Sequence, residues 1–94
     1  MKPFITIELD KVRKLKYGIN QLVLLEDLLK VPLAKLDMSS LSIANVRDII
    51  FAGLSHEDKE LTQEKVGDLI DEHSSLEQVV EKITEAFEVS FGKK

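Results

Sequence analysis

Two histidines are the side chains of this sequence best suited to metal binding or acid–base catalysis near neutral pH. His56 and His73 each stand beside acidic residues in a polar segment, HED and DEH. A metal site needs several converging ligands, and neither histidine has a second one four residues away. We therefore expect both to be exposed residues of a loop or a helix end, and not metal ligands or catalytic bases.

The other reactive residue types give no stronger signal. Asp and Glu total 17, so two carboxylates will come close by accident and such a pair does not indicate an acid and a base. No serine lies in an activating motif, and the four glycines are too scattered for a phosphate-binding loop. The absence of cysteine excludes disulfides and thiolate metal sites. We expect a protein that is not an enzyme and has no metal and no cofactor.

Length and hydropathy favour one small domain over residues 1–94. A chain of this length buries somewhat more than ~60% of the surface that it exposes when unfolded, so its core is modest. The apolar content of 44% is that of an ordinary globular protein. No run reaches the ~18 apolar residues of a membrane-spanning helix, and the N-terminus lacks the apolar run of a signal peptide. We expect a cytoplasmic protein with no membrane partner.

The first third of the chain is expected to form a β-hairpin and a helix. Apolar and polar side chains alternate in Phe4–Leu9 and again in Arg13–Tyr17, which is the pattern of half-buried strands. Gly18 then opens a helix over Ile19–Lys30. Pro32 ends this helix because its ring disfavours helical geometry at the preceding residue.

Three more helices are expected in the rest of the chain. Ser42 can cap a central helix whose apolar residues recur at helical spacing. Thr62 can cap another over Gln63–Glu72. Either Ser75 with Gln78 or Ser74 with Glu77 can form the capping box of a last helix over Leu76–Phe91. The predicted fold class is mainly α (α+β), with an N-terminal β-hairpin followed by a bundle of about four helices.

Charge is distributed unevenly along the chain. Residues 1–47 carry eight Lys or Arg and five acidic residues, whereas residues 57–88 carry three Lys and eleven acidic residues. Glu77, Glu81 and Glu85, the acidic strip, share one face of the last helix, where each like-charge pair costs about a few tenths of a kcal/mol. The strip is either a solvated face or a docking surface for a basic partner or the basic half of a neighbouring copy.

The helix that contains QLVLLEDLL has apolar side chains on more than one face. At 100° per residue, Leu24, Leu25 and Leu28 point largely away from Ile19. Either the hairpin and the turn after Pro32 cover these three leucines, or another polypeptide does. The three leucines and the acidic strip are the predicted protein-interaction residues.

The segment over residues 61–88 has the outline of a helix-turn-helix, a motif of DNA-binding regulators. Its second helix would enter the major groove, yet it carries the glutamates of the acidic strip, and phosphate contacts require Lys or Arg. DNA contact would therefore fall to the basic hairpin, through Arg13, Lys14 and Lys16. We expect no nucleic-acid partner.

Four short motifs follow one another along the chain. They are a glycine that opens a helix, an apolar–Glu pair inside it, a small–Gly–Leu ending of the next helix and a Leu-Thr-x-Glu-x-Val helix start. In this sequence the motifs are Gly18, Leu25-Glu26, Ala52-Gly53-Leu54, and Leu61-Thr62 with Glu64 and Val66. In order and spacing they are similar to the small tail assembly chaperones of long-tailed bacteriophages and prophages, over about residues 4–87.

The resemblance implies a non-enzymatic chaperone in the cytoplasm of the bacterial host that is absent from the mature virion. Its implied partner is the tape measure protein, a long helical protein that such chaperones coat until tail tube subunits polymerise around it. The tail tube protein and further copies of the chain are the other partners considered. Two alternatives stay open: a helix-turn-helix DNA-binding prophage regulator and a small protein–protein adaptor domain.

Overall fold

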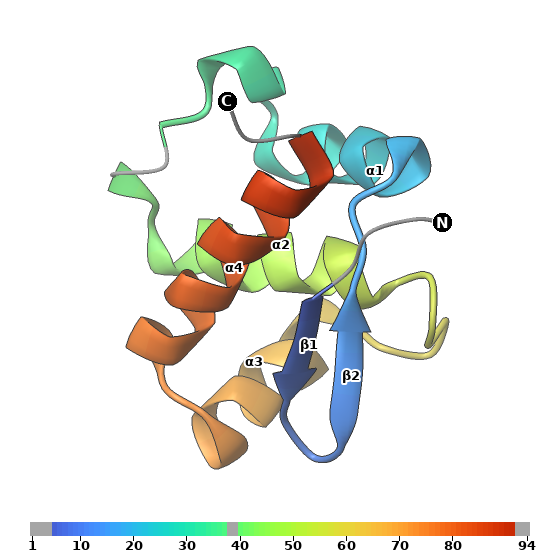
Figure 1. Ribbon diagram of the computed structural model, residues 1–94, viewed down its shortest axis with the longest axis vertical. Coiled ribbons are helices and arrows are strands. Elements are labelled where there is room, and N and C mark those ends of the chain that lie inside the picture. Colours follow the sequence, from blue (N-terminus) through green and yellow to red (C-terminus); the bar gives the residue numbers. More distant parts are fainter. Residues whose placement is uncertain (1–4, 38–39, 92–94) are drawn as a thin grey trace.

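The computed structural model describes the backbone of residues 5–37 and 40–91 and the side chains of residues 5–37 and 40–88. In this part of the chain a two-stranded hairpin precedes four α-helices (Figure 1). The elements are β1 (Ile5–Glu8), β2 (Val12–Leu15), α1 (Ile19–Leu29), the short 3₁₀ helix η1 (Leu33–Lys35), α2 (Ile43–Leu54), α3 (Gln63–His73) and α4 (Leu76–Phe91). The predicted mainly α fold with an N-terminal hairpin is confirmed. Phe4, expected to begin the first strand, lies outside the described residues.

The hairpin is antiparallel and buries one face, as its alternating pattern predicts. Ile7 lies opposite Arg13 in the register, and both side chains are buried. β2 ends at Leu15, two residues earlier than expected. The reason is that the Lys16 amide donates to the Gly53 carbonyl of α2 at 3.1 Å and therefore leaves the strand pairing.

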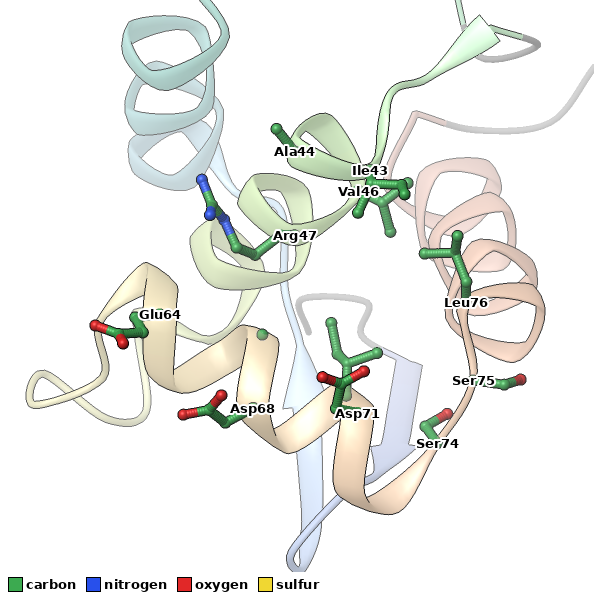
Figure 2. Close-up of a pocket in the computed structure, with 12 residues that line it drawn as sticks. Ile43, Ala44, Val46, Arg47, Glu64, Asp68, Asp71, Ser74, Ser75 and Leu76 are labelled. Carbon is green, nitrogen blue, oxygen red and sulfur yellow. The ribbon is translucent and has the colours of Figure 1, made fainter.

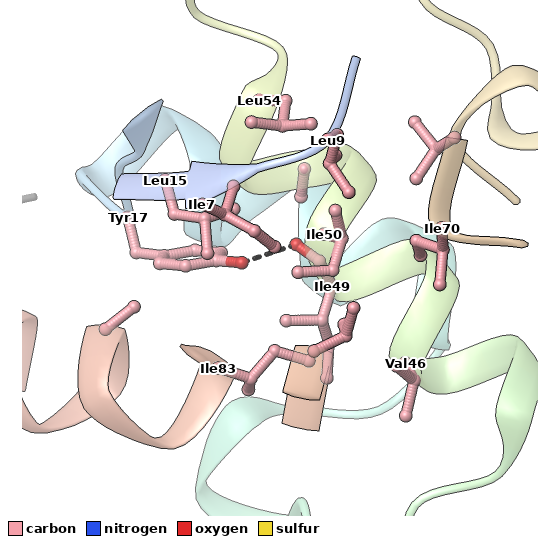
Figure 3. Close-up of a cluster of buried hydrophobic side chains, with 14 of the residues drawn as sticks. Ile7, Leu9, Leu15, Tyr17, Val46, Ile49, Ile50, Leu54, Ile70 and Ile83 are labelled. Carbon is pink, nitrogen blue, oxygen red and sulfur yellow. Dashed lines mark hydrogen bonds between the residues drawn. The ribbon is translucent and has the colours of Figure 1, made fainter. Parts of the chain in front are cut away.

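The core is built around α2, which packs against the hairpin and against α1, α3 and α4. Ile49 and Ile50 are fully buried on α2 (Figure 3). Tyr17 reaches into this cluster, and its hydroxyl donates to the Ile49 carbonyl at 2.6 Å. Its ring meets that of Phe87 edge to face, with 5.0 Å between centroids. Tyr17, two residues after β2, thereby joins the hairpin to α2 and α4. Burial raises the pKa of its hydroxyl, so that the group remains a donor.

Each of the three predicted serine or threonine caps forms. The hydroxyl of Ser42 accepts from the backbone amide three residues on at 3.0 Å, that of Thr62 at 3.1 Å and that of Ser75 at 3.2 Å. These bonds satisfy amides that have no partner within the helix. The caps therefore fix where α2, α3 and α4 begin.

The helix α1 ends one residue before the expected position. Lys30 adopts a left-handed conformation with φ of 63°, and its amide donates to the Glu26 carbonyl at 2.8 Å. The Glu26 carboxylate accepts from the Leu33 amide at 2.8 Å, which ties η1 back onto α1. Pro32 directly precedes η1, as the sequence predicts for a helix stop.

Candidate protein-binding groove

A groove of about 570 Å³ opens between the first turns of α2 and α4 and the length of α3 (Figure 2). Its apolar lining consists of Ile43, Ala44 and Val46 from α2, Ile70 from α3 and Leu76 from α4. Val46 and Ile70 belong to the core, but Ile43 is 71% exposed and Leu76 is 42% exposed. We call this feature the α2–α3–α4 groove. Its floor is continuous with the core, and its mouth is formed by apolar side chains in water.

Acidic side chains line the α3 side of the groove. Glu64, Asp68 and Asp71 follow one another along α3 at helical spacing, and all three are exposed (Figure 2). Arg47 is the one basic residue among the described residues of the lining. The groove therefore combines an apolar centre with a negatively charged side.

Arg47 does not balance these carboxylates, because it is bound elsewhere. Its guanidinium lies 3.1 Å from Asp48 Oδ1, and Asp48 is buried. The same carboxylate oxygen accepts from Gln63 Nε2 at 2.7 Å, so Asp48 links α2 to the first residue of α3. These bonds hold the wall between α2 and α3 in position.

The predicted apolar contact residues of α1 are largely covered. Leu25 is fully buried, Leu24 is half-buried against the core and Leu28 is half-buried. The large apolar side chains of α1 that stand in water are instead Ile19, 75% exposed, and Val23, 54% exposed. The expectation that Leu25 offers itself to a partner is corrected, because α2 packs against α1 and the core closes over this leucine. Any binding by Leu24 and Leu28 stays a prediction.

The acidic strip faces solvent along α4. Glu77, Glu81 and Glu85 are all exposed, and Glu85 lies 3.7 Å from Lys82 in a surface ion pair. A pair of this kind contributes little to stability. The exposure is compatible with both interpretations of the strip, so its role as a docking surface also stays a prediction.

The basic hairpin does not present Arg13 to a nucleic acid. Arg13 is 4% exposed, and two of its nitrogens donate to the Asp10 carboxylate at 2.8 and 2.9 Å. A third donates to Asp58 at 3.4 Å. The pKa of Asp10 lies below its usual value, chiefly because of the hydrogen bond from Arg13. Of the three hairpin cations expected to meet a phosphate, Arg13 is thus already paired inside the protein, whereas Lys14 is exposed and Lys16 half-buried.

The two histidines lie in different environments. Nε2 of His56 lies 2.9 Å from the Lys14 carbonyl, and the ring is half-buried against β2, whereas we expected it to be exposed. His73 is exposed at the end of α3, as expected. Among residues 5–37 and 40–88, no group of three or more His, Cys, Asp or Glu is placed to hold a metal ion.

The groove was not predicted from the sequence. Ile43 and Leu76 each follow a capping serine directly, and this position is the one signal that could have singled them out. A side chain in the first turn extends past the end of its helix, where a neighbouring element does not always cover it.

Within the described ranges, none of the helices has both the length and the apolar character required to cross a bilayer. Comparison with protein-family models, with curated proteins and with solved structures gave no match for this chain.

Proposed function

We propose that this protein is a non-enzymatic tail assembly chaperone of a long-tailed phage or prophage, which binds the tape measure protein before the tail is built. Two lines of reasoning support the proposal. One is the ordered series of motifs from Gly18 to Val66 that resembles this family. The other is the α2–α3–α4 groove, whose exposed apolar side chains fit a protein that holds another polypeptide.

The groove is the single observation of the structure on which the proposal depends. Exposed Ile43 and Leu76 stand at the mouth of an opening whose floor is made by core residues. A client side chain placed between them would remove apolar surface from water on both partners. A chaperone that must later release its client needs such a limited contact rather than a large one.

The motif residues have structural roles that fit a shared fold. Leu25 is buried and Glu26 binds the Leu33 amide, so the apolar–Glu pair holds the end of α1. Gly53 lies within the buried small–Gly–Leu ending of α2, and Thr62 caps α3. The resemblance therefore rests on residues that shape the domain, and the client contact rests on the groove.

Co-expression tests the proposal directly. The chain is produced together with a tape measure protein from the same phage or prophage, and the soluble fraction of the large protein is measured. We expect a severalfold increase over expression with an unrelated acidic protein of similar size, and co-purification of the two chains. An unchanged soluble fraction without co-purification would refute the assignment.

Two features of the described residues argue against the DNA-binding alternative. Arg13 is bound to Asp10 and Asp58, and the helix that would enter the major groove carries the acidic strip. A mobility-shift assay with random duplex at low salt measures this alternative, and we expect no retarded band.

A further inference from the structure

The α2–α3–α4 groove has an apolar centre that the chain does not cover itself. Ile43 and Leu76 come from two different helices and gather at the same opening (Figure 2). Neither is needed to fill the core, since Ile43 is 71% and Leu76 42% exposed. Two large apolar side chains facing one opening are what an anchor residue of a partner requires.

The surroundings of the groove favour a helical occupant over an extended one. All of its described lining residues belong to α2, α3, α4 or the short α3–α4 turn, so no strand edge borders it. An extended segment would leave its own amides and carbonyls without backbone partners there. A helix satisfies these groups internally and needs only side-chain contacts, with apolar anchors three or four residues apart.

The charge of the groove indicates which residues should stand beside the apolar anchors of the bound helix. Glu64, Asp68 and Asp71 present three exposed carboxylates, and Arg47 is held by Asp48. Like charges at this spacing repel one another along α3. Lys or Arg on either side of the apolar anchors would relieve the repulsion and orient the helix.

We infer that the α2–α3–α4 groove binds an amphipathic helix that inserts apolar anchors between Ile43 and Leu76 and sets Lys or Arg against the carboxylates of α3. This inference rests on the proposed function, because it assigns the client-binding site and the chemistry of the client segment. A second copy of the chain is the competing occupant, since Ile19 and Val23 give each copy an exposed apolar pair on α1.

The test uses the intact protein and fluorescein-labelled model helices. One peptide contains only Leu and Lys in an amphipathic order, a second has Glu in place of Lys, and a third is the first with its order scrambled. Fluorescence anisotropy gives the dissociation constants at low and at physiological ionic strength. We expect the Leu–Lys helix to bind, more weakly as salt rises, and the other two to bind at least about tenfold more weakly.

Two groove variants locate the binding site. Ile43→Ser with Leu76→Ser removes the apolar mouth, and Glu64→Gln with Asp68→Asn and Asp71→Asn removes the carboxylates. Each should weaken binding of the Leu–Lys helix by about tenfold or more, as the loss of an interface hot spot does. Circular dichroism of both variants checks that the fold is retained, which we expect because all but the partly exposed Leu76 are well exposed.

Matched controls carry the same chemical changes on other faces. They are Ile19→Ser with Val23→Ser on α1, and Glu77→Gln with Glu81→Gln and Glu85→Gln on α4. We expect both to bind like the wild type. If a control weakens binding and the groove variants do not, the inference is overturned in favour of α1 or the acidic strip.

Sedimentation velocity of the protein alone shows whether a second copy of the chain, and not a client helix, occupies the groove. Concentration-dependent association that Ile43→Ser with Leu76→Ser abolishes would make a second copy the occupant and overturn the inference. The co-expression experiment tests the chaperone assignment separately from this inference. If the groove variants keep the client soluble as well as the wild type does, this inference fails and the chaperone assignment remains. If the Leu–Lys helix binds the groove but the wild type does not keep the client soluble, the chaperone assignment fails and the groove remains a helix-binding site.

Discussion

Replacing Gly53 by alanine should destabilise the protein far more than an ordinary glycine-to-alanine change in a helix. A methyl group at this position would lie 2.6 Å from Tyr17 Oη, 2.7 Å from Tyr17 Cζ and 2.9 Å from Leu15 Cδ2. Tyr17 cannot easily move aside, because its hydroxyl is bound to the Ile49 carbonyl and its ring packs on Phe87. The change therefore forces the hairpin away from α2.

The size of the effect follows from three terms. Overpacking a well-filled core costs about 1–3 kcal/mol, and three contacts under 3.0 Å place Gly53→Ala at the upper end. A lost Tyr17 hydrogen bond adds about 1 kcal/mol, and the higher helix propensity of alanine returns about 1 kcal/mol. We expect a net loss of about 2–4 kcal/mol, or a fall in melting temperature of roughly 10–30 °C.

Chemical denaturation followed by circular dichroism measures this difference. The matched control is Gly67→Ala on α3, where the nearest atom to the new methyl group is Arg47 Cδ at 3.7 Å, so the protein should be unchanged or about 1 kcal/mol more stable. In a Tyr17→Phe background, Gly53→Ala should cost less, because one of the close contacts is gone. A Gly53→Ala protein as stable as the Gly67→Ala protein would refute the packing of Tyr17 against α2.

Three further predictions concern burial, pH and capping. Leu25→Ala should lower the free energy of unfolding by about 2–5 kcal/mol in urea denaturation, since the side chain is fully buried, and a loss under 0.5 kcal/mol would return Leu25 to the surface. The pKa of Asp10 is lowered, chiefly by its hydrogen bond from Arg13, so this carboxylate stabilises the fold at pH values above its usual pKa of 3.8 and the benefit is lost as pH falls through the lower folded value. Asp10→Asn should therefore flatten the decline in stability over this acid range, and an unchanged pH profile would contradict the linkage. Ser42→Ala removes the bond to the Asn45 amide and should cost about 1 kcal/mol by thermal melting, with Ser42→Asp retaining most of the stability and an unaffected alanine variant excluding a capping role.

The sequence determined the elements and most of their ends, because these depend on neighbouring residues. The alternation of apolar and polar side chains near the N-terminus predicts the hairpin, and Pro32 predicts that α1 ends shortly before it. The hydroxyls of Ser42 and Thr62 predict the starts of α2 and α3, since a cap needs only the amides three residues away. Local chemistry suffices for each of these features.

Only the tertiary structure decided which faces are covered. The helix α1 has apolar residues on several sides, and its sequence cannot say that α2 covers Leu25 while Ile19 stays in water. The burial of Arg13 depends in the same way on Asp58, 45 residues further on.

The candidate site follows the same division, because the groove joins the starts of α2 and α4 with one side of α3. Ile43 and Leu76 are far apart in sequence, and both read as ordinary members of an apolar stripe. Their exposure results from the angles at which three helices meet, and these angles are set by packing across the whole core. The sequence gives the chemical character of each residue, but the fold determines whether its side chain is exposed to a partner.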